Sequence, residues 1–538
     1  MVAIILDRNW KKALMKTIIF PKRTFMKADL ILCNANIITM DPFSPSAELV
    51  AIRGNKIWTV SRKKDLKDLK NHRTVVIDCC RSTILPGFHD AHGHLSALAE
   101  SLVNLNVSPA RGVKAISALQ VEIRKLAQEL PPGAWIRAGG YSEFYLQEQR
   151  HPNRFDLDAA TSLHPVKLTH RSGHAHVLNS LALKFCGITK ETPDPDGGLI
   201  DRDLETGDPT GVLYGMSEFL SQKIPPLESQ QLEKGIKLAG LELLSSGITS
   251  FEDASPTNNL QRWRMFTDWK GRGFLRSRVR MLWGFKGFKE SCRTLPLPSG
   301  EEEQVPRGGV KIILDETTGR LNPGPAELNE MVFQIHQLGW QVVLHALEER
   351  TIEAACSAIE YALQRAPSLD HRHRIEHCAV CPPSLARRLA AIGIYVVTQP
   401  SFIYTSGERY LKTVPAEQMK HLYPLSTLAR SGIIVAAGSD CPIAPVNPLV
   451  GIYAASSRLA ASGQAVLPEE KIEISEALSL YTIHAAKATF TEKIKGSIRP
   501  GHLADLVILN GDPTRLSVNE IRDLQVKMTI INGEPVWP

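Results

Sequence analysis

Residues 85–94 read Leu-Pro-Gly-Phe-His-Asp-Ala-His-Gly-His, an extended segment that ends with two imidazoles at positions i and i+2. Side chains two residues apart on a strand point to the same side, so His92 and His94 can bind one metal ion. The pair alone is weak evidence, because the chain has 17 histidines and a second such pair at His174 and His176. Isolated pairs are more often surface or hydrogen-bonded core histidines. The rest of the chain therefore has to decide whether this is a metal site.

Short apolar runs bounded by turn residues recur along the chain and alternate with stretches of helical periodicity. Eight of these runs are predicted to be strands, at residues 84–94, 248–253, 278–285, 309–315, 340–345, 374–377, 394–399 and 433–440. Amphipathic stretches long enough for helices lie between them, for example at residues 325–338, 349–364 and 383–392. The pattern predicts an α/β fold and favours a (β/α)8 TIM barrel over the alternative, a doubly wound parallel sheet.

Residues of the types that bind metals recur at the C-terminal ends of these runs. The first run ends in His92 and His94, the fifth in His345, the sixth in His377 and the eighth in Asp440. In a barrel these ends converge on the mouth that holds active sites. Singly, each residue has an ordinary explanation, such as a hydrogen-bonded histidine or a helix-capping aspartate. Together they predict a site for zinc or a similar divalent ion, with one position open to water.

Lys311 lies within the fourth run, where an ammonium facing a cationic metal site would be repelled. Two outcomes are reasonable. The side chain points elsewhere and pairs with an acid such as Asp315, or carbon dioxide carboxylates it to a carbamate that can bridge two metals. The residues alone leave both open.

The formal net charge of +7 comes largely from the N-terminus, where seven basic residues within the first 27 face a single acid, Asp7. The rest of the chain is close to neutral and shows no nucleic-acid footprint. Residues 1–25 read as a basic leader that is disordered or dispensable, since a strand-like sequence starts at Met26. A targeting peptide or a membrane-surface segment is the alternative.

Composition is ordinary for a globular protein, with 43% hydrophobic and 22% charged residues. No apolar run reaches the roughly 20 residues needed to span a bilayer, so no membrane partner is expected. Nine cysteines, an odd number, indicate reduced thiols and a cytoplasmic location. The pair Cys378 and Cys381 is interpreted as two buried thiols, because no second pair lies near it.

Several separated motifs resemble the amidohydrolase superfamily, and within it the amidohydrolase-3 branch that contains the N-substituted formamide deformylases. The resemblance runs from about residue 29 to residue 537. It is carried by Pro-Gly-Phe-His-Asp-Ala-His-Gly-His at 86–94, Gly-Ile-Thr at 247–249, Val-Lys at 310–311, His-Ala at 345–346, Arg-Ile-Glu-His at 374–377, Gly-Ser-Asp at 438–440 and Gly-Ser-Ile-Arg-Pro-Gly-His-Leu-Ala-Asp-Leu-Val at 496–507.

The resemblance implies that His92 and His94 hold a buried metal, that His345 and His377 hold a more exposed one, and that Lys311 bridges them as its carbamate. Asp440 would be the catalytic carboxylate and a further metal ligand. The resemblance also implies a small β-sandwich made from residues 26–83 and 495–538, beside a barrel formed by residues 84–100 and 236–494. Two departures from many relatives, Glu348-Glu349 after the fifth strand and Glu316 after the fourth, lie at the barrel mouth and leave the substrate open.

The connection between the first and second runs is far longer than a barrel helix requires, and such a segment usually carries its own structure and function. We expect residues 101–235 to form an insertion that covers the barrel mouth as a lid, with His174 or His176 contacting substrate. The alternative is that these two histidines only hold the insertion together.

The chain is therefore expected to be a hydrolase of a non-peptide carbon–nitrogen bond, such as a formamide or another small amide, by attack of metal-bound hydroxide. Asp440 would take the proton from the water and deliver it to the leaving nitrogen. The expected cofactor is zinc, one or two ions per chain, with carboxylated Lys311; the partner is a small amide, and a homodimer is allowed. A mononuclear-metal deaminase of a heterocycle, or a catalytically inactive barrel used for binding or assembly, is the alternative.

Overall fold

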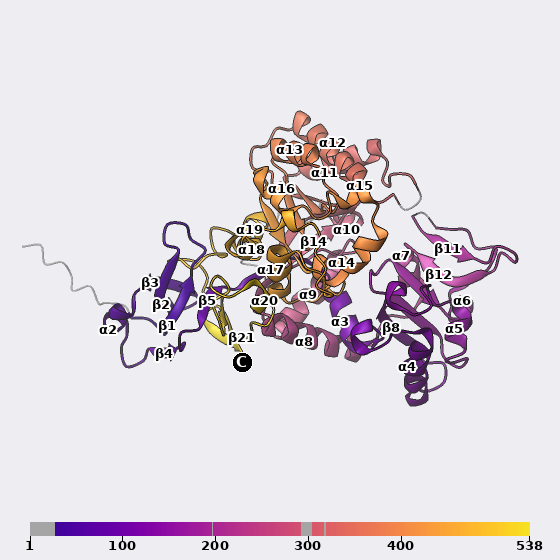
Figure 1. Cartoon of the computed structure of the whole chain (residues 1–538), viewed down its shortest axis with the longest axis horizontal. Coiled ribbons are helices and arrows are strands. Elements are labelled where there is room, and N and C mark those ends of the chain that lie inside the picture. The colour runs from indigo at the N-terminus through magenta and orange to yellow at the C-terminus, as the bar shows by residue number, and fades with distance from the viewer. Residues whose placement is uncertain (1–26, 196, 292–303, 317–318) are drawn as a thin grey trace, which may run out of the picture.

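The computed structural model describes residues 27–195, 197–291, 304–316 and 319–538, so the predicted leader at residues 1–25 lies outside the described part. The strands form three sheets (Figure 1). The central sheet carries the predicted site, a second sheet contains strands from both ends of the chain, and a third belongs to the long connection after the first barrel strand.

The central sheet is a nearly closed, all-parallel barrel of eight strands, which confirms the predicted α/β barrel. In chain order its members are β6 (Phe88–Gly93), β13 (Ile248–Asp253), β14 (Arg278–Gly284), β15 (Arg307–Ile313), β16 (Val342–Ala346), β17 (Arg374–His377), β18 (Tyr395–Thr398) and β19 (Val435–Ala437). The first and last members meet just beyond their ends, where Asp440 N donates to His92 O at 2.7 Å and His94 N donates to Cys441 O at 3.0 Å.

Helices surround this barrel, as the sequence periodicity predicts (Figure 1). They are α3 (Leu95–Val103), α8 (Ser229–Ser245), α9 (Leu260–Gly271), α10 (Phe285–Ser291), α11 (Pro325–Gln337), α12 (Glu349–Arg365), α13 (Pro383–Ile392), α14 (Ser401–Thr413), α15 (Ala416–Met419), α16 (Leu425–Arg430), α17 (Pro448–Ser457), α18 (Ile474–Leu480) and α19 (Ile483–Ala488). Outward-facing strand residues such as Phe251, Met281 and Trp283 pack into one large apolar cluster with the helices. Residues that face the barrel interior include buried charges, among them Glu252 and Arg374.

The first predicted run, residues 84–94, is divided between two sheets, which corrects its expected extent. Its first part is β5 (Thr83–Pro86), which pairs antiparallel with β20 (Leu506–Leu509) near the C-terminus. Only β6 belongs to the barrel. The break falls at Gly87, where an added Cβ would lie 2.2 Å from Thr249, so only glycine fits this close approach of two strands.

Strands from both chain ends share the second sheet, in the order β22-β21-β20-β5-β1-β2-β3, with β4 pairing β1. Besides β5 and β20, they are β1 (Leu30–Ile38), β2 (Ser46–Arg53), β3 (Lys56–Ser61), β4 (Val75–Asp78), β21 (Val526–Ile531) and β22 (Glu534–Trp537). Short helices α2 (Leu66–Leu69) and α20 (Val518–Ile521) accompany them.

The long connection forms the third sheet, in the order β11-β12-β10-β9-β8-β7, with its own apolar cores. Its strands are β7 (Leu105–Asn106), β8 (Ile136–Tyr141), β9 (Val166–His170), β10 (Ala175–Leu178), β11 (Leu199–Arg202) and β12 (Pro209–Tyr214). Its helices are α4 (Ile116–Glu129), α5 (Arg154–Asp158), α6 (Ser180–Cys186) and α7 (Ser217–Lys223).

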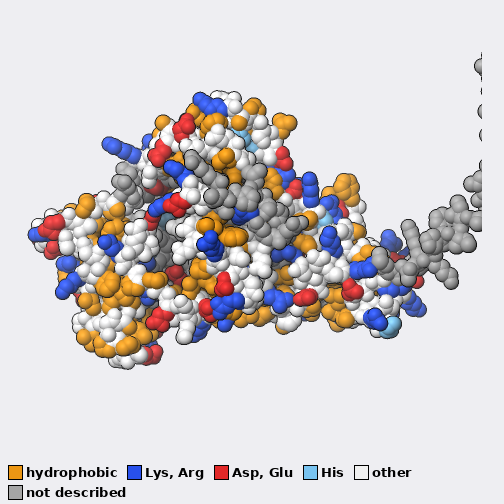
Figure 2. Space-filling model, turned by 180° about the vertical axis from the view of Figure 1, so that it is seen from behind, with side chains coloured by type: hydrophobic (Ala, Val, Ile, Leu, Met, Phe, Trp, Pro, Cys, Tyr) orange, Lys and Arg blue, Asp and Glu red, His pale blue; other side chains and the backbone are white. Residues whose placement is uncertain are grey.

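The face in Figure 2 carries basic and acidic side chains interspersed, while hydrophobic side chains gather on the lobe formed by the connection. Within the described part, no helix is long and apolar enough to cross a membrane. The eight cysteines of that part are free, and Cys378 and Cys381 are both buried.

Candidate metal centre

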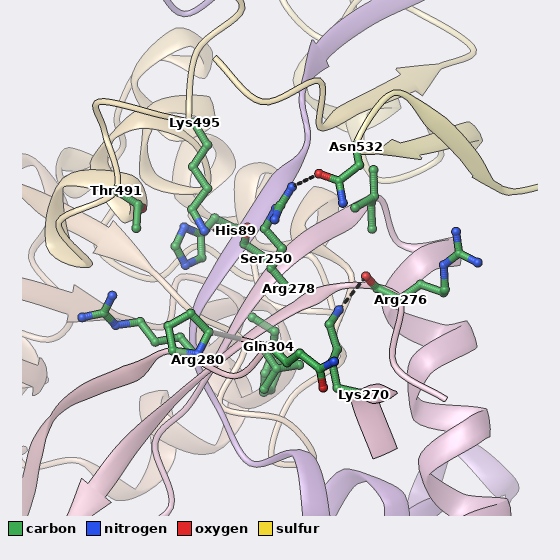
Figure 3. Close-up of a pocket in the computed structure, with 14 residues that line it drawn as sticks. His89, Ser250, Lys270, Arg276, Arg278, Arg280, Gln304, Thr491, Lys495 and Asn532 are labelled. Carbon is green, nitrogen blue, oxygen red and sulfur yellow. Dashed lines mark hydrogen bonds between the residues drawn. The ribbon is translucent and has the colours of Figure 1, made fainter. Parts of the chain in front are cut away.

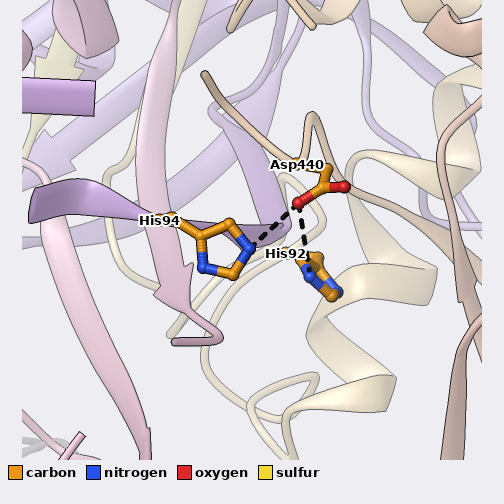
Figure 4. A group of neighbouring side chains, drawn as sticks. All are labelled: His92, His94 and Asp440. Atoms are coloured by element: carbon orange, nitrogen blue, oxygen red, sulfur yellow. Dashed lines mark ion pairs between the residues drawn. The ribbon is translucent and has the colours of Figure 1, made fainter. Parts of the chain in front are cut away.

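Three predicted ligands meet at the C-terminal end of the barrel (Figure 4). Asp440 Oδ1 lies 3.0 Å from His94 Nε2 and 3.6 Å from His92 Nε2. Candidate ligand atoms of the three residues all lie within 4.8 Å of one another. Imidazole nitrogen and carboxylate oxygen are the donors that zinc prefers, so this group fits a divalent ion.

His345 on β16 and His377 on β17 continue this group. The His377 ring centroid is 4.9 Å from that of His92 and 4.4 Å from that of His345. The parallel register of β16 with β17 places His377 beside Ala346, at the same level of the barrel. The structure thus brings all four predicted histidine ligands into one continuous cluster.

Lys311 points into the barrel and is buried, with 2% of the residue exposed. Within the described residues its Nζ has no hydrogen-bond partner, so the expected alternative of a pair with Asp315 is not formed. Burial lowers the pKa of Lys311 to about 8, against the raising effect of Glu376 and Asp440. A buried, unpaired nitrogen near carboxylates and histidines fits the other alternative, a carbamate that takes part in metal binding.

The charge states of the ligands suit a metal. Burial is the largest influence on Asp440 and raises its pKa, but the hydrogen bond from His94 and the charges of His92 and His377 outweigh it, and the pKa is lowered. Burial holds the pKa of His92 and His345 well below the usual value, helped by the positive charge of Lys311. Metal ligands must be ionised carboxylates and neutral imidazoles.

The backbone is unusual at two of the ligands. His377 has φ of 71° and Asp440 has φ of 55°, the left-handed region that non-glycine residues seldom adopt. Such conformations persist where surrounding structure imposes them and are common at functional sites. At Gly438 an added Cβ would lie 2.5 Å from His92 N, so the approach to Asp440 requires glycine there.

The two histidines of the insertion have different surroundings. The His174 side chain is exposed, but neighbouring atoms displace part of its water, and this desolvation lowers its pKa. The charge of Asp440 raises the pKa and the charge of His94 lowers it. Its neighbour Arg171 donates to Thr405 O at 3.1 Å on barrel helix α14. The segment before β10 therefore lies against the barrel mouth, and His174 with it.

His176 does not reach the mouth. It is buried within β10, with 3% of the residue exposed. Its Nδ1 lies 3.3 Å from Thr169 Oγ1 and its Nε2 lies 2.8 Å from Ser217 Oγ, both in the insertion. This arrangement agrees with the alternative in which the residue holds the insertion together.

Several partners of the ligands were not anticipated from the sequence. Nδ1 of His92 contacts Glu376 Oε2, Nδ1 of His94 lies 3.1 Å from Ser255 Oγ, and Nδ1 of His377 lies 2.7 Å from Gln399 Oε1. The alternation of charged residues at positions 374 and 376 of β17, both facing the barrel interior, is the signal that could have indicated Glu376.

Comparison with known proteins agrees with this geometry. A sequence model of the amidohydrolase family matches residues 75–537. The chain is 29% identical to an N-substituted formamide deformylase of Arthrobacter pascens, over 94% of this chain and 97% of that protein. It is 28% identical to a putative amidohydrolase, YtcJ, of Bacillus subtilis (strain 168), over 85% of this chain and 89% of that protein.

A crystal structure of an uncharacterized metal-dependent hydrolase from Pyrococcus horikoshii OT3 shares the fold, with a TM-score of 0.72 at 21% identity. The matched region spans 91% of this chain and 99% of the Pyrococcus chain. The chain therefore belongs to the amidohydrolase family and is a hydrolase that acts on carbon–nitrogen bonds.

Proposed function

We propose that the protein hydrolyses a formamide or another small, non-peptide amide at a metal centre in the barrel mouth. The observation that carries the proposal is the convergence of His92, His94 and Asp440, at distances of 3.0 and 3.6 Å between their polar atoms. The similarity to an N-substituted formamide deformylase over nearly the whole of both chains supports a formamide as the first substrate class to test.

His92 and His94 would hold one zinc ion, His345 and His377 a second, and Lys311 would bridge them as a carbamate. The ammonium of Lys311 first loses a proton, and the neutral amine then adds carbon dioxide and releases a second proton, so that a cationic side chain becomes an anionic carbamate. That change removes the repulsion between an ammonium and the metals. The buried Nζ, which has no hydrogen-bond partner among the described residues, supports this assignment.

A divalent metal bound there lowers the pKa of a coordinated water to roughly 7 and polarises the carbonyl. Asp440, held close to both first-strand histidines, accepts a proton from water and delivers it to the leaving nitrogen. Its lowered pKa keeps the carboxylate ionised at neutral pH.

The insertion, residues 101–235, would act as a lid in which His174 contacts the substrate while His176 supports the lid. Arg171 anchors the segment before β10 to α14 with bonds to Thr405 O and to Ser406 Oγ at 3.0 Å. The rest of the chain would form two further domains. Residues 84–100 and 236–494 would form the barrel, and residues 26–83 and 495–538 would form the small β-sandwich.

The deciding experiment combines metal analysis with a substrate screen. Protein purified with and without bicarbonate is assayed for zinc, iron, manganese and nickel, and then screened on formamides and small amides. We expect two metals per chain, bicarbonate-dependent occupancy and release of formate or another carboxylate. A Lys311→Ala variant should lose the bicarbonate response. The matched variant Lys270→Ala should keep it, because Lys270 lines a separate cavity together with Arg278 and Arg280.

Other outcomes would overturn the proposal. One metal per chain with ammonia release from a heterocycle would make the protein a deaminase. A folded chain that takes up no metal would make it a binding or assembly protein. Unchanged metal content and turnover in Lys311→Ala would reject the bridging role of Lys311.

A further inference from the structure

One partner of the ligand histidines differs in kind from the others. Ser255 and Gln399, which contact His94 and His377, are neutral, whereas Glu376, which contacts His92, is a carboxylate. In each case the partner occupies Nδ1 and leaves Nε2 for the mouth of the barrel. The charged partner belongs to His92, which is only 1% exposed.

Glu376 is itself fixed by a chain of buried ion pairs. Its Oε1 lies 2.7 Å from Arg374 Nε, and Arg374 NH2 lies 2.5 Å from Glu252 Oε2. All three side chains are 0% exposed. Glu252 Oε1 lies 3.3 Å from Arg280 Nε, and Arg280 lines a cavity at the opposite end of the barrel (Figure 3). Two acids and two bases thus alternate along the barrel axis behind His92.

The strand geometry explains why these groups align. Arg374 and Glu376 are two residues apart on β17, so both side chains face the barrel interior. Buried charges are tolerated only when they are paired, because desolvation costs several kcal/mol per ion. Arg374 therefore holds Glu376 through Oε1, while Oε2 of Glu376 contacts His92.

A carboxylate that accepts from imidazole Nδ1–H fixes the tautomer and makes Nε2 a stronger donor to metal. We propose that Glu376 is a positioning residue for His92, held by Arg374 and Glu252, and that its charge sets the metal affinity of the His92 and His94 position. The proposal rests on the metal-dependent function proposed above. It goes beyond that function in assigning control of the affinity to a residue that does not bind the metal.

The test compares Glu376→Gln with Ser255→Ala in the full-length protein. Glutamine keeps an oxygen that can accept from His92 but removes the charge, while Ser255→Ala removes the neutral partner of His94. Zinc affinity is measured by chelator competition, and cobalt substitution reports the ligand field through its visible absorption. We expect Glu376→Gln to weaken zinc binding about 10- to 100-fold and to shift the cobalt spectrum, with a much smaller effect of Ser255→Ala.

Glu376→Gln leaves Arg374 without one partner, so folding is checked by circular dichroism. Two further variants keep the test decisive if that variant unfolds. Glu376→Asp retains the charge and should bind zinc more tightly than Glu376→Gln. The double variant Arg374→Gln with Glu376→Gln removes both charges of the pair and should fold, yet still bind zinc weakly.

Failure of this proposal differs from failure of the proposed function. If the wild-type protein takes up no metal, the function fails. If the wild type binds zinc while a folded Glu376→Gln or double variant binds it equally well with an unchanged cobalt spectrum, only the role of Glu376 is rejected. An equal loss of affinity in Ser255→Ala would also reject the role of the charge.

Discussion

Two histidine pairs with the same spacing, His92 with His94 and His174 with His176, have very different structures. Both rings of the first pair approach Asp440, at 3.6 and 3.0 Å. In the second pair, His174 lies just before β10 at the barrel mouth, while His176 lies inside β10 and its two ring nitrogens contact hydroxyls of the insertion. Equal spacing therefore brings both imidazoles to one carboxylate only where another segment supplies that carboxylate opposite the pair.

The first prediction concerns Asp440, the carboxylate that both rings of the first histidine pair approach, and removes its ability to accept a proton. Asp440→Asn keeps a side chain of the same shape but cannot accept the proton from water. We expect turnover to fall about 10³-fold, with metal content near that of the wild type. Steady-state kinetics and elemental analysis of one preparation measure both. A normal rate would show that the proton goes elsewhere.

The second prediction concerns the exposed member of the other pair. His174→Ala removes an exposed side chain whose pKa is influenced by the charge of Asp440. We expect kcat/KM to fall about 10-fold, roughly 1.4 kcal/mol of transition-state stabilisation, with unchanged metal content and thermal stability. Loss of metal would instead make His174 a ligand, and unchanged kinetics would remove it from the substrate site.

The third prediction concerns the buried member. His176→Ala leaves the hydroxyls of Thr169 and Ser217 without their partner, which should lower the free energy of unfolding by about 1–3 kcal/mol. Its effect on turnover should be smaller than that of His174→Ala. Urea denaturation gives the stability and the amide assay gives the rate. A reversed result, with stable protein and slow turnover, would exchange the two roles.

The fourth prediction concerns the pH dependence of stability. Burial lowers the pKa of His176 to about 3, with a further lowering effect of Lys167. The unfolded chain titrates near 6.5, so below that pH only the unfolded state takes up the proton and stability falls towards pH 3. Without this histidine, the slope of unfolding free energy against pH should be shallower by at most about 1.4 kcal/mol per pH unit. Parallel curves for wild type and His176→Ala between pH 7 and 4.5 would contradict this.

Much of the barrel could be predicted because its strands are short apolar runs with clear ends. The predicted run at residues 374–377 coincides with β17. The eighth run was predicted at residues 433–440, but the strand is only Val435–Ala437, because Gly438 passes close to the backbone of His92 and Asp440 adopts a left-handed conformation. Such contacts between the first and last strands are not visible in a local pattern.

The candidate site shows the same limit. The ligand types could be recognised because they end successive runs. The direction of Lys311 was open, since a strand pattern does not say which face is the barrel interior when both faces are buried. Glu376 was missed because His92, which it contacts, and Glu252, which pairs with its neighbour Arg374, come from other strands, and such contacts form only when the barrel closes.

Gly87 lies between two strands that belong to different sheets of the molecule. On one side, β5 is paired with β20 near the C-terminus, and on the other β6 ends in His92 and His94. Gly87 N also donates to Asp505 O at 2.9 Å. Pairing with a strand near the C-terminus therefore fixes the start of the segment that carries the histidine pair, so truncation of the chain before β20 would free that end of the segment.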